Sequence, residues 1–250
     1  MTATPAPDAD NTWHGTLTLG TDWALWEGTI GDTSVHRHFA AQAVLAQRPD
    51  DGPSTLAIAA ANGEVLHAPA LLIEPLQPHR LLHSASSGPA RVVFIEPRRR
   101  PAASLPAEIR AALSAAMGSA RMLPPTSTGF WSAWQADAGP DVPAEEDAWE
   151  ATVRAAIDEL APQGAVALAE IARRVYLSPE RLRHVFADRI GMNFRRFVLW
   201  RRLLLAGPWL QRGASITEAA HGAGFADAAH FARTLRSTFG LNASRARLIR

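Results

Sequence analysis

"YLSPERLRHVFADRIG" at residues 176–191 and "GFADAAHFARTLRSTFG" at residues 224–240 decide the fold, because the second stretch repeats the pattern of the first. Each stretch begins with a short polar turn and continues into a helical pattern with outward-pointing arginine or histidine side chains. Each then closes on a glycine. The repeat predicts two equivalent helices, each with a basic outer face and an apolar inner face.

The first unit is predicted to contain a helix over 168–174, a turn over 175–177 and a second helix behind it. Ser178 is a natural N-cap, and Pro179 suits the first helical position, where its missing N–H costs nothing. The inner face of the second helix comprises Leu182, Val185 and Phe186. The outer face carries Glu180, Arg181, Arg183 and His184. Two short helices with a basic second helix indicate a helix-turn-helix.

The second unit begins at Ser215 and Glu218, which have the spacing of a capping box. Gly222 and Gly224 permit the turn, and Asp227 can cap the next helix. The core face of that helix is predicted to hold Phe231, Leu235 and Phe239. The exposed side is predicted to hold His230, Arg233 and Arg236 beside the small Ala228, Ala229 and Ala232. Small side chains let a helix lie close to base edges.

The stretch between the units predicts one long amphipathic helix. From Asn193 to Arg212 it would span about 30 Å at about 1.5 Å per residue. One turn of B-DNA is about 34 Å, so such a helix can hold two recognition helices in successive major grooves. Pro208 removes a helical hydrogen bond, and we expect a kink or an early end there.

Charge is segregated along the chain. The formal net charge is only +1, but residues 1–160 carry about −9 and residues 161–250 about +10. All 25 basic residues are arginine, which is most simply explained by a GC-rich genome, whereas the separation of sign is not. A basic segment of this size is expected to bind a polyanion such as nucleic acid.

The front of the chain reads as short strands separated by Gly, Asp, Pro and Ser. Their spacing of about ten residues favours an antiparallel sandwich or barrel. The predicted strands cover residues 13–20, 23–30, 34–40, 42–47, 54–60, 64–75, 79–85 and 90–97. Trp13, Trp23 and Trp26 lie within them, with packing as the favoured role and an aromatic effector cage as the alternative.

Between the strands and the repeated units, the period changes to that of amphipathic helices over 105–118 and 145–160. The apolar stripes consist of Ile109, Leu113 and Met117 in the first helix and Trp149, Val153, Ile157 and Leu160 in the second. A Pro/Gly-rich connection between them holds Phe130, Trp131 and Trp134. Two roles are open for these stripes: they pack against the strands or the next domain, or they form a dimer interface. The break at 161–164 is predicted to be a linker.

The C-terminal ninety residues resemble the DNA-binding domain of AraC/XylS-family transcription regulators. The matching motifs are "LAEIARRVYLSPERLRHVFADRIGMNFRRFV" and "SITEAAHGAGFADAAHFARTLRSTFGLNAS". The resemblance implies that each recognition helix reads a major groove of double-stranded DNA. Base contacts are then implied for Glu180, Arg183 and His184 in the first helix and for Ala228, Ala229, His230 and Arg233 in the second. Arg181 and Arg236 would lie near the DNA backbone.

The front half also contains a group of histidines. His36 and His38 are two residues apart, so both would project from one face of a strand, and His79 lies on a later strand. The set is similar to the metal triad of cupins, although the place of the cupin glutamate is taken by the neutral Gln42. Three roles stay open for these histidines: a divalent metal site, the lining of an effector pocket, or a structural or solvent-facing position.

These patterns together predict four segments: a tail (1–12), a cupin-like β-barrel sensor domain (13–104), a helical connector or dimerisation region (105–160) and an all-α DNA-binding domain (161–250). The predicted protein is a sequence-specific transcription regulator and not an enzyme, controlled by an effector or metal in the barrel. The alternative is a cupin-type metal enzyme tethered to nucleic acid. Double-stranded DNA, a small-molecule effector, RNA polymerase and a second copy of the chain are the expected partners. The chain has no cysteine and no apolar run or leader typical of membrane or secreted proteins, which favours the cytoplasm.

Overall fold

The structure is a computed structural model of the 250-residue chain. It describes residues 13–47, 55–83, 88–97, 105–125, 129–136, 148–239 and 246–248. The expected tail at 1–12 lies outside the described residues.

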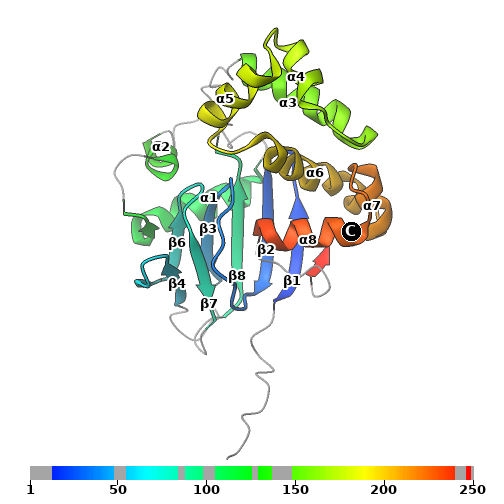
Figure 1. The fold of residues 1–250 in the computed structure, drawn as a ribbon. Coiled ribbons are helices and arrows are strands. Elements are labelled where there is room, and N and C mark those ends of the chain that lie inside the picture. The colour runs from blue at the N-terminus through cyan, green and yellow to red at the C-terminus, as the bar shows by residue number, and fades with distance from the viewer. Residues whose placement is uncertain are drawn as a thin grey trace, which may run out of the picture.

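The N-terminal part is built from β-strands arranged in two sheets (Figure 1). Its strands are β1 (His14–Leu19), β2 (Trp23–Thr29), β3 (Ala41–Ala46), β4 (Leu56–Ala60), β5 (Val65–Ala68), β6 (Ala70–Ile73), β7 (His79–Leu82), β8 (Ala90–Ile95) and β9 (Arg121–Leu123). The larger sheet has the order β10-β1-β2-β8-β3-β6-β9, in which β10 is Ala246–Leu248, and the smaller has the order β5-β4-β7. The β-rich class is therefore confirmed, but pairing in the described ranges gives two sheets and not one closed barrel.

Two of the predicted strands differ from the structure. The stretch over 34–40 is not a strand, and only His36 pairs there, in an isolated bridge to His79. The stretch over 64–75 forms two strands, because the strand is interrupted at Pro69. The two resulting strands, β5 and β6, belong to different sheets. Proline lacks the N–H that a ladder requires, which explains the break. The three early tryptophans are buried as expected, and the rings of Trp13 and Trp26 meet edge to face.

Helices cover one face of the large sheet. They are α1 (Ala107–Ala116), followed by a 3-10 turn η1 (Met117–Ser119), and α2 (Phe130–Ala136). Ile109, Leu113 and Trp131 are fully buried against Val93 and other sheet residues. The Pro/Gly-rich connection between the two predicted helices therefore contains a short helix of its own, which the sequence did not predict.

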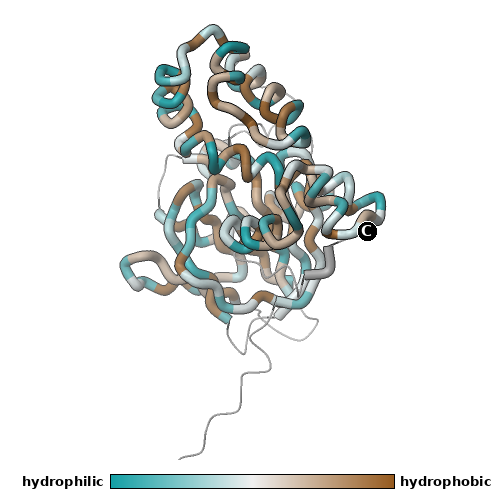
Figure 2. Tube along the Cα trace, turned by 45° about the vertical axis from the view of Figure 1, so that its right-hand side comes forward, coloured by the Kyte–Doolittle hydropathy of each residue, from teal (hydrophilic) through white to brown (hydrophobic). Residues whose placement is uncertain are grey.

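The remaining helices form the C-terminal part, which stands at the top and right of Figure 1. They are α3 (Ala148–Leu160), the 3-10 turn η2 (Ala161–Gln163), α4 (Leu168–Arg174), α5 (Pro179–Ile190), α6 (Phe194–Gln211), α7 (Ile216–Gly222) and α8 (Ala228–Phe239). Hydrophobic and hydrophilic residues alternate along α3, α4 and α5, as amphipathic helices require (Figure 2). A last strand, β10 (Ala246–Leu248), was not expected and pairs in parallel with β1.

The apolar stripes of the predicted connector are buried within the chain. Val153 and Ile157 of α3 join the core of the C-terminal helices, and Ile109 and Leu113 of α1 face the sheet. The apolar residues from which self-association was expected therefore already pack inside one copy. The predicted linker at 161–164 is a packed turn, in which Ala161 is buried and the carbonyl of Gly164 accepts a hydrogen bond from Arg202.

The two parts of the chain share one core. Phe94 of β8 meets Phe239 of α8 with ring centroids 4.6 Å apart, and Phe39 packs edge to face on Phe197 and Trp200 of α6. In Figure 1, α6 runs above the strands and α8 crosses in front of them. No helix within the described residues is long and apolar enough to span a membrane.

Candidate DNA-binding surface, interdomain cavity and histidine cluster

The first helix-turn-helix has the caps that the sequence predicts. Ser178 accepts a hydrogen bond from the Arg181 backbone N–H at 3.2 Å, and Pro179 occupies the first turn of α5. Gly191 ends α5 in the left-handed conformation, with φ of 76°, where glycine carries no Cβ penalty. Helix α4 also begins and ends at the predicted residues.

Helix α5 has one buried and one exposed face. Leu182 and Phe186 are fully buried, and Phe186 packs on the rings of Phe194 and Phe197. The exposed side chains are those that the sequence places there: Glu180, Arg181, Arg183 and His184. Arg183 donates to Glu180 at 2.8 Å, an exposed pair that contributes little stability, so both groups remain available to a ligand.

The second unit is capped as predicted. Ser215 and Glu218 form a reciprocal capping box at the start of α7, and Asp227 accepts the His230 backbone N–H at 2.6 Å at the start of α8. Gly224 in the turn has a φ of 82°, and a Cβ there would collide with the carbonyl of Ala161. The turn therefore requires glycine and lies directly against the end of α3.

Helix α8 buries Phe231, Leu235 and Phe239 and leaves a basic stripe outside. Ala229, Arg233 and Arg236 are exposed at i, i+4 and i+7, so they share one face of the helix. Ala228 and His230 are half-buried, and the His230 ring stands 5.2 Å from that of Phe225.

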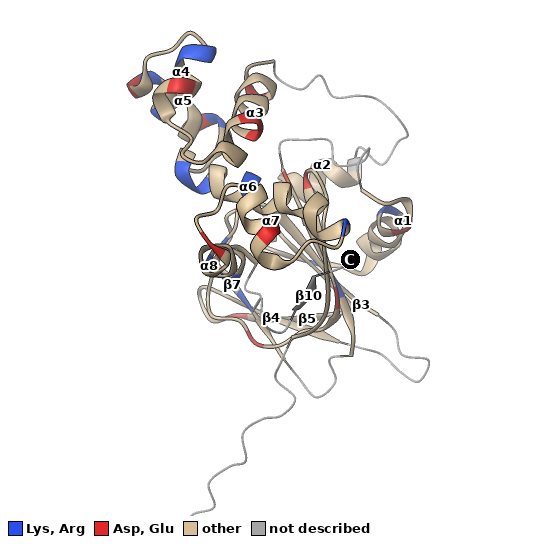
Figure 3. Cartoon of the chain, turned by 90° about the vertical axis from the view of Figure 1, so that its right-hand side faces the viewer, with Lys and Arg blue, Asp and Glu red and all other residues tan. Residues whose placement is uncertain are grey.

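Not every arginine of the basic segment is available to a polyanion. Arg174 binds Glu159 at 2.6 Å, and Arg173 binds Glu170 at 2.7 Å. Basic residues nevertheless mark α4, α5 and the start of α6 in Figure 3. Those left on the surface of this region include Arg181, Arg183, Arg195 and Arg196.

A buried ion-pair network around Arg201 was missed at the sequence level. Arg201 makes two hydrogen bonds of 2.8 Å to Asp158 and a third of 2.8 Å to Glu96. Trp200 also donates to Glu96, at 3.0 Å. Burial opposes the charge on Arg201, but the two carboxylates outweigh it and raise its pKa. The available signal was that Arg201 falls on the apolar stripe of α6, four residues after Phe197.

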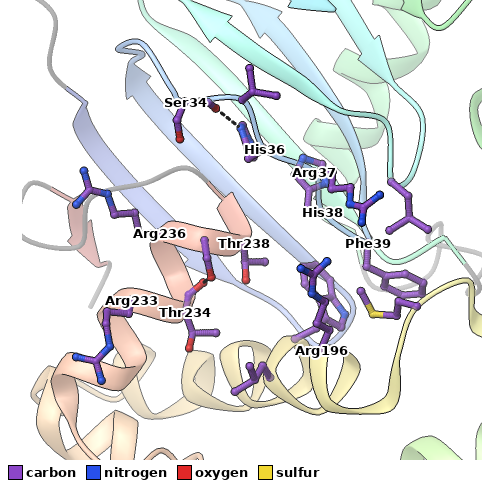
Figure 4. A pocket seen from close by; sticks show the side chains of 16 residues that line it. Ser34, His36, Arg37, His38, Phe39, Arg196, Arg233, Thr234, Arg236 and Thr238 are labelled. Atoms are coloured by element: carbon purple, nitrogen blue, oxygen red, sulfur yellow. Dashed lines mark hydrogen bonds between the residues drawn. The ribbon is translucent and has the colours of Figure 1, made fainter. Parts of the chain in front are cut away.

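A cavity of about 620 Å³ lies between the segment 34–39 and helices α6 and α8 (Figure 4). Its lining includes four arginines, Arg37, Arg196, Arg233 and Arg236, and no carboxylate among the described residues. Two of these arginines belong to the exposed stripe of α8. The cavity is thus electropositive, and it joins the β-rich part to a candidate recognition helix.

The three histidines that the sequence singles out come together beside this cavity, and His36 and His38 line it. One ring nitrogen of each lies within 4.8 Å of those of the other two. His36 is half-buried, whereas His38 and His79 are buried. They do not share a strand face as expected, because 34–40 is a loop that the His36–His79 bridge holds against β7. Gln42 of β3 completes the group, with its Oε1 2.8 Å from Nε2 of His38.

Burial disfavours the charged form of the three histidine rings. Burial lowers the pKa of all three, and burial together with the neighbouring His36 lowers the pKa of His38 to about 4. Neutral imidazole is the form that binds metal.

Known proteins share the helical part of this geometry. A family model described as a helix-turn-helix domain matches residues 171–248, which include most of the first unit and all of the second. The transcriptional activator RhrA of Rhizobium meliloti (strain 1021) is 30% identical over 97 residues, which cover 38% of this chain and 31% of that protein. The resemblance of the C-terminal part to AraC/XylS-family regulators is thereby confirmed. The chain spans about a third of the length of RhrA.

Solved structures extend the likeness, in fold alone, beyond the helical part. The apo form of a ToxT point variant from Vibrio cholerae strain SCE256 has a TM-score of 0.55 at 12% identity, covering 91% of this chain and 97% of that one. Wild-type ToxT from the same strain, with an unsaturated fatty acid bound, has a TM-score of 0.52 at 12% identity, covering 88% and 92%. The two-part fold is therefore confirmed. The matched relative RhrA is a transcriptional activator and not an enzyme, so the alternative of a cupin-type enzyme is not favoured.

Proposed function

We propose that this chain is an AraC-type, sequence-specific DNA-binding transcription regulator that places α5 and α8 in successive major grooves. The main observation that supports this proposal is the pair of capped helices on either side of α6, each with a polar, basic exposed face. Helix α6 has 18 residues, and its length is about 27 Å at about 1.5 Å per residue. That length is of the order of one helical turn of DNA, about 34 Å.

The exposed side chains divide into base-reading and phosphate-binding groups. In α5, Arg183 and His184 can donate to base acceptors, and Glu180 can accept from the cytosine amino group. The Glu180–Arg183 pair offers an acceptor and a donor side by side, which is the complement of a G·C pair. Arg181 is proposed to bind phosphate.

In α8, Arg233 is proposed to read a base edge, with His230 beside it. The small Ala228 and Ala229 allow the helix to approach the groove floor, where an alanine methyl can contact a thymine methyl. Arg236 is proposed to bind the DNA backbone. Exposure supports these assignments for Ala229, Arg233 and Arg236, and helical position supports them for the half-buried Ala228 and His230.

Control by an effector is proposed to act through the cavity next to α8. Any occupant of the cavity lies against Arg233 and Arg236, and both side chains belong to the proposed DNA surface. ToxT, which shares the fold, has been solved with an unsaturated fatty acid bound. A ligand that contacts α8 differently in the two states changes DNA affinity.

A competition assay tests the base-reading assignment. A duplex selected by the full chain from a random-sequence pool is compared with its single-base-pair variants. Arg183→Ala and Arg233→Ala should each lose about 1–3 kcal/mol of binding free energy and lose preference at one base pair. Arg181→Ala should weaken binding to all duplexes alike and lower the salt slope by about one.

Arg80→Ala provides the matched control, because Arg80 is an exposed arginine on β7 and should leave DNA binding unchanged. If Arg183→Ala and Arg233→Ala weakened binding to every duplex by the same factor, these residues would not read bases.

A further inference from the structure

The histidine cluster has an unusual hydrogen-bond pattern. In each ring Nδ1 lies against a backbone carbonyl: His36 with Ser34 at 2.9 Å, His38 with Ala40 at 2.7 Å and His79 with Gln77 at 2.8 Å. A carbonyl oxygen can only accept, so Nδ1 carries the hydrogen in all three rings. A neutral imidazole has one N–H, and each Nε2 therefore presents a lone pair.

Two of these lone pairs have no donor to bind, because Nε2 of His36 and Nε2 of His79 are buried without a hydrogen-bond partner. Nε2 of His38 faces Oε1 of Gln42, which is also an acceptor, while Nε2 of Gln42 is itself buried without a partner. Rotating the Gln42 amide by 180° would supply a donor to His38, but it would leave His36 and His79 without one. Buried acceptors of this kind are normally satisfied by a donor or a cation.

A single metal ion satisfies all of them. Metal-bound histidines characteristically donate their second ring N–H to a backbone carbonyl or carboxylate, which fixes the ring and its tautomer. Nitrogens bound to one Zn²⁺ at about 2.0–2.1 Å stand about 3.4 Å apart in tetrahedral geometry. One ring nitrogen of each histidine already lies within 4.8 Å of those of the other two, so a small inward movement of the rings reaches that spacing.

We propose that His36, His38 and His79 bind a divalent first-row transition-metal ion through their Nε2 atoms, with Oε1 of Gln42 as a neighbouring oxygen ligand. Neutral imidazoles favour zinc, copper, nickel or iron over magnesium or calcium, which prefer carboxylate oxygens. Half-buried His36 borders the cavity, through which the ion can enter.

The ion would also act on the DNA-binding helices. Phe39 follows His38 directly, and its ring packs on Phe197 and Trp200 of α6. His36 and His38 line the cavity opposite Arg233 of α8 (Figure 4). Drawing the histidines together moves this wall of the cavity, so the ion is the proposed regulator of DNA affinity. This second half of the inference rests on the proposed function.

Calorimetric titration of the chelator-treated full chain with Zn²⁺ tests the metal site. One Zn²⁺ should bind per chain. His36→Ala should lower the affinity for Zn²⁺ by more than about 100-fold. Loss of a residue that only hydrogen-bonds to a metal ligand already costs about 10–100-fold in metal affinity. His67→Ala, an exposed histidine of β5, is the matched control and should bind as the wild type does. Equal binding by wild type and His36→Ala, or no stoichiometric binding, would overturn the site.

Two further measurements separate loss of a ligand from loss of the fold. Gln42→Glu replaces a neutral oxygen ligand with a charged one and should tighten Zn²⁺ binding by about tenfold or more, whereas weaker binding would remove Gln42 from the site. With Co²⁺ as the probe, the wild type should show a visible absorption band for nitrogen coordination that His36→Ala lacks. A band of equal intensity in His36→Ala would place the ion elsewhere.

DNA binding with and without Zn²⁺ tests the regulatory half. Zn²⁺ should change the affinity of the wild type for its selected duplex by about 5-fold or more, and His67→Ala should respond equally. Zn²⁺ binding without a change in DNA affinity would overturn regulation and leave the metal site. Absence of DNA binding in both states would instead overturn the proposed function, while the titration would still decide the metal site.

Discussion

At the scale of single residues, the guanidinium of Arg201 joins three distant parts of the chain. It contacts Asp158 of α3, Glu96 after β8 and, at 3.0 Å, the carbonyl of Thr21. Paired hydrogen bonds to a carboxylate are the favoured geometry for arginine. Charges in a buried site cost much to desolvate, so the network is stable only while every member keeps its partners.

Arg201→Met should therefore lower the free energy of unfolding by about 3–5 kcal/mol, since it leaves the buried Glu96 without its nearest cation. The double variant with Glu96→Gln should recover part of that loss. Urea unfolding measures both, with the exposed Arg195→Met as a control that stays within about 0.5 kcal/mol of the wild type. A loss below about 1 kcal/mol for Arg201→Met would show that the network contributes little.

At the scale of elements, α6 shows how a helix tolerates a glycine followed by a proline, Gly207 and Pro208. It continues through Pro208 to Gln211, so the helix does not end early there. The helix is fixed to the sheet at this point, because Gln211 donates to the carbonyl of Leu19 at 3.1 Å. Gly207 packs so closely on Leu19 that a Cβ would collide with its backbone, whereas Pro208 faces solvent.

The neighbouring substitutions Gly207→Ala and Pro208→Ala should have opposite effects. Alanine at 207 is overpacked against Leu19 and should cost about 1–3 kcal/mol. Alanine at 208 restores a helical N–H and should stabilise by about 2 kcal/mol, because proline costs about 3 kcal/mol inside a helix and regains part of this through the unfolded chain. Thermal and urea unfolding measure both. If both variants changed the free energy of unfolding in the same direction, this account of α6 would be contradicted.

Elements specified by neighbouring residues could be predicted from the sequence, and elements specified by distant ones could not. The caps at Ser178 and Ser215 act within three residues, and the helices they begin were predicted correctly. Helix α2 begins where the carboxylate of Glu74 accepts the backbone N–H groups of Phe130 and Trp131. That cap lies 56 residues away along the chain, so no local pattern reveals it.

The candidate site follows the same rule. Side chains on α5 and α8 could be assigned to the outer faces because helical spacing decides them. The three histidines were expected to meet because His36 and His38 would share one face of a strand and His79 would lie on a later strand. In the structure, residues 34–40 form a loop, and a bridge between this loop and β7 brings the three together. The cavity depends on how α8 packs against the loop, which no spacing in the sequence encodes.

At the scale of the whole molecule, the β-rich and helical parts are one packed body. Their buried side chains form a continuous cluster that runs from Trp13 through Phe94 to Phe239. Helix α8 is therefore held by the sheet at its C-terminal end while its basic stripe faces outward. A change in the cavity beside it has a direct physical route to the proposed DNA surface.

Hydroxyl-radical footprinting of the full chain on its selected duplex tests the central claim most directly. Two recognition helices on either side of α6 predict two protected windows on one face of the duplex, about 10–10.5 base pairs apart. Protection confined to a single window, or spread evenly along any duplex, would contradict the proposal that α5 and α8 read successive major grooves.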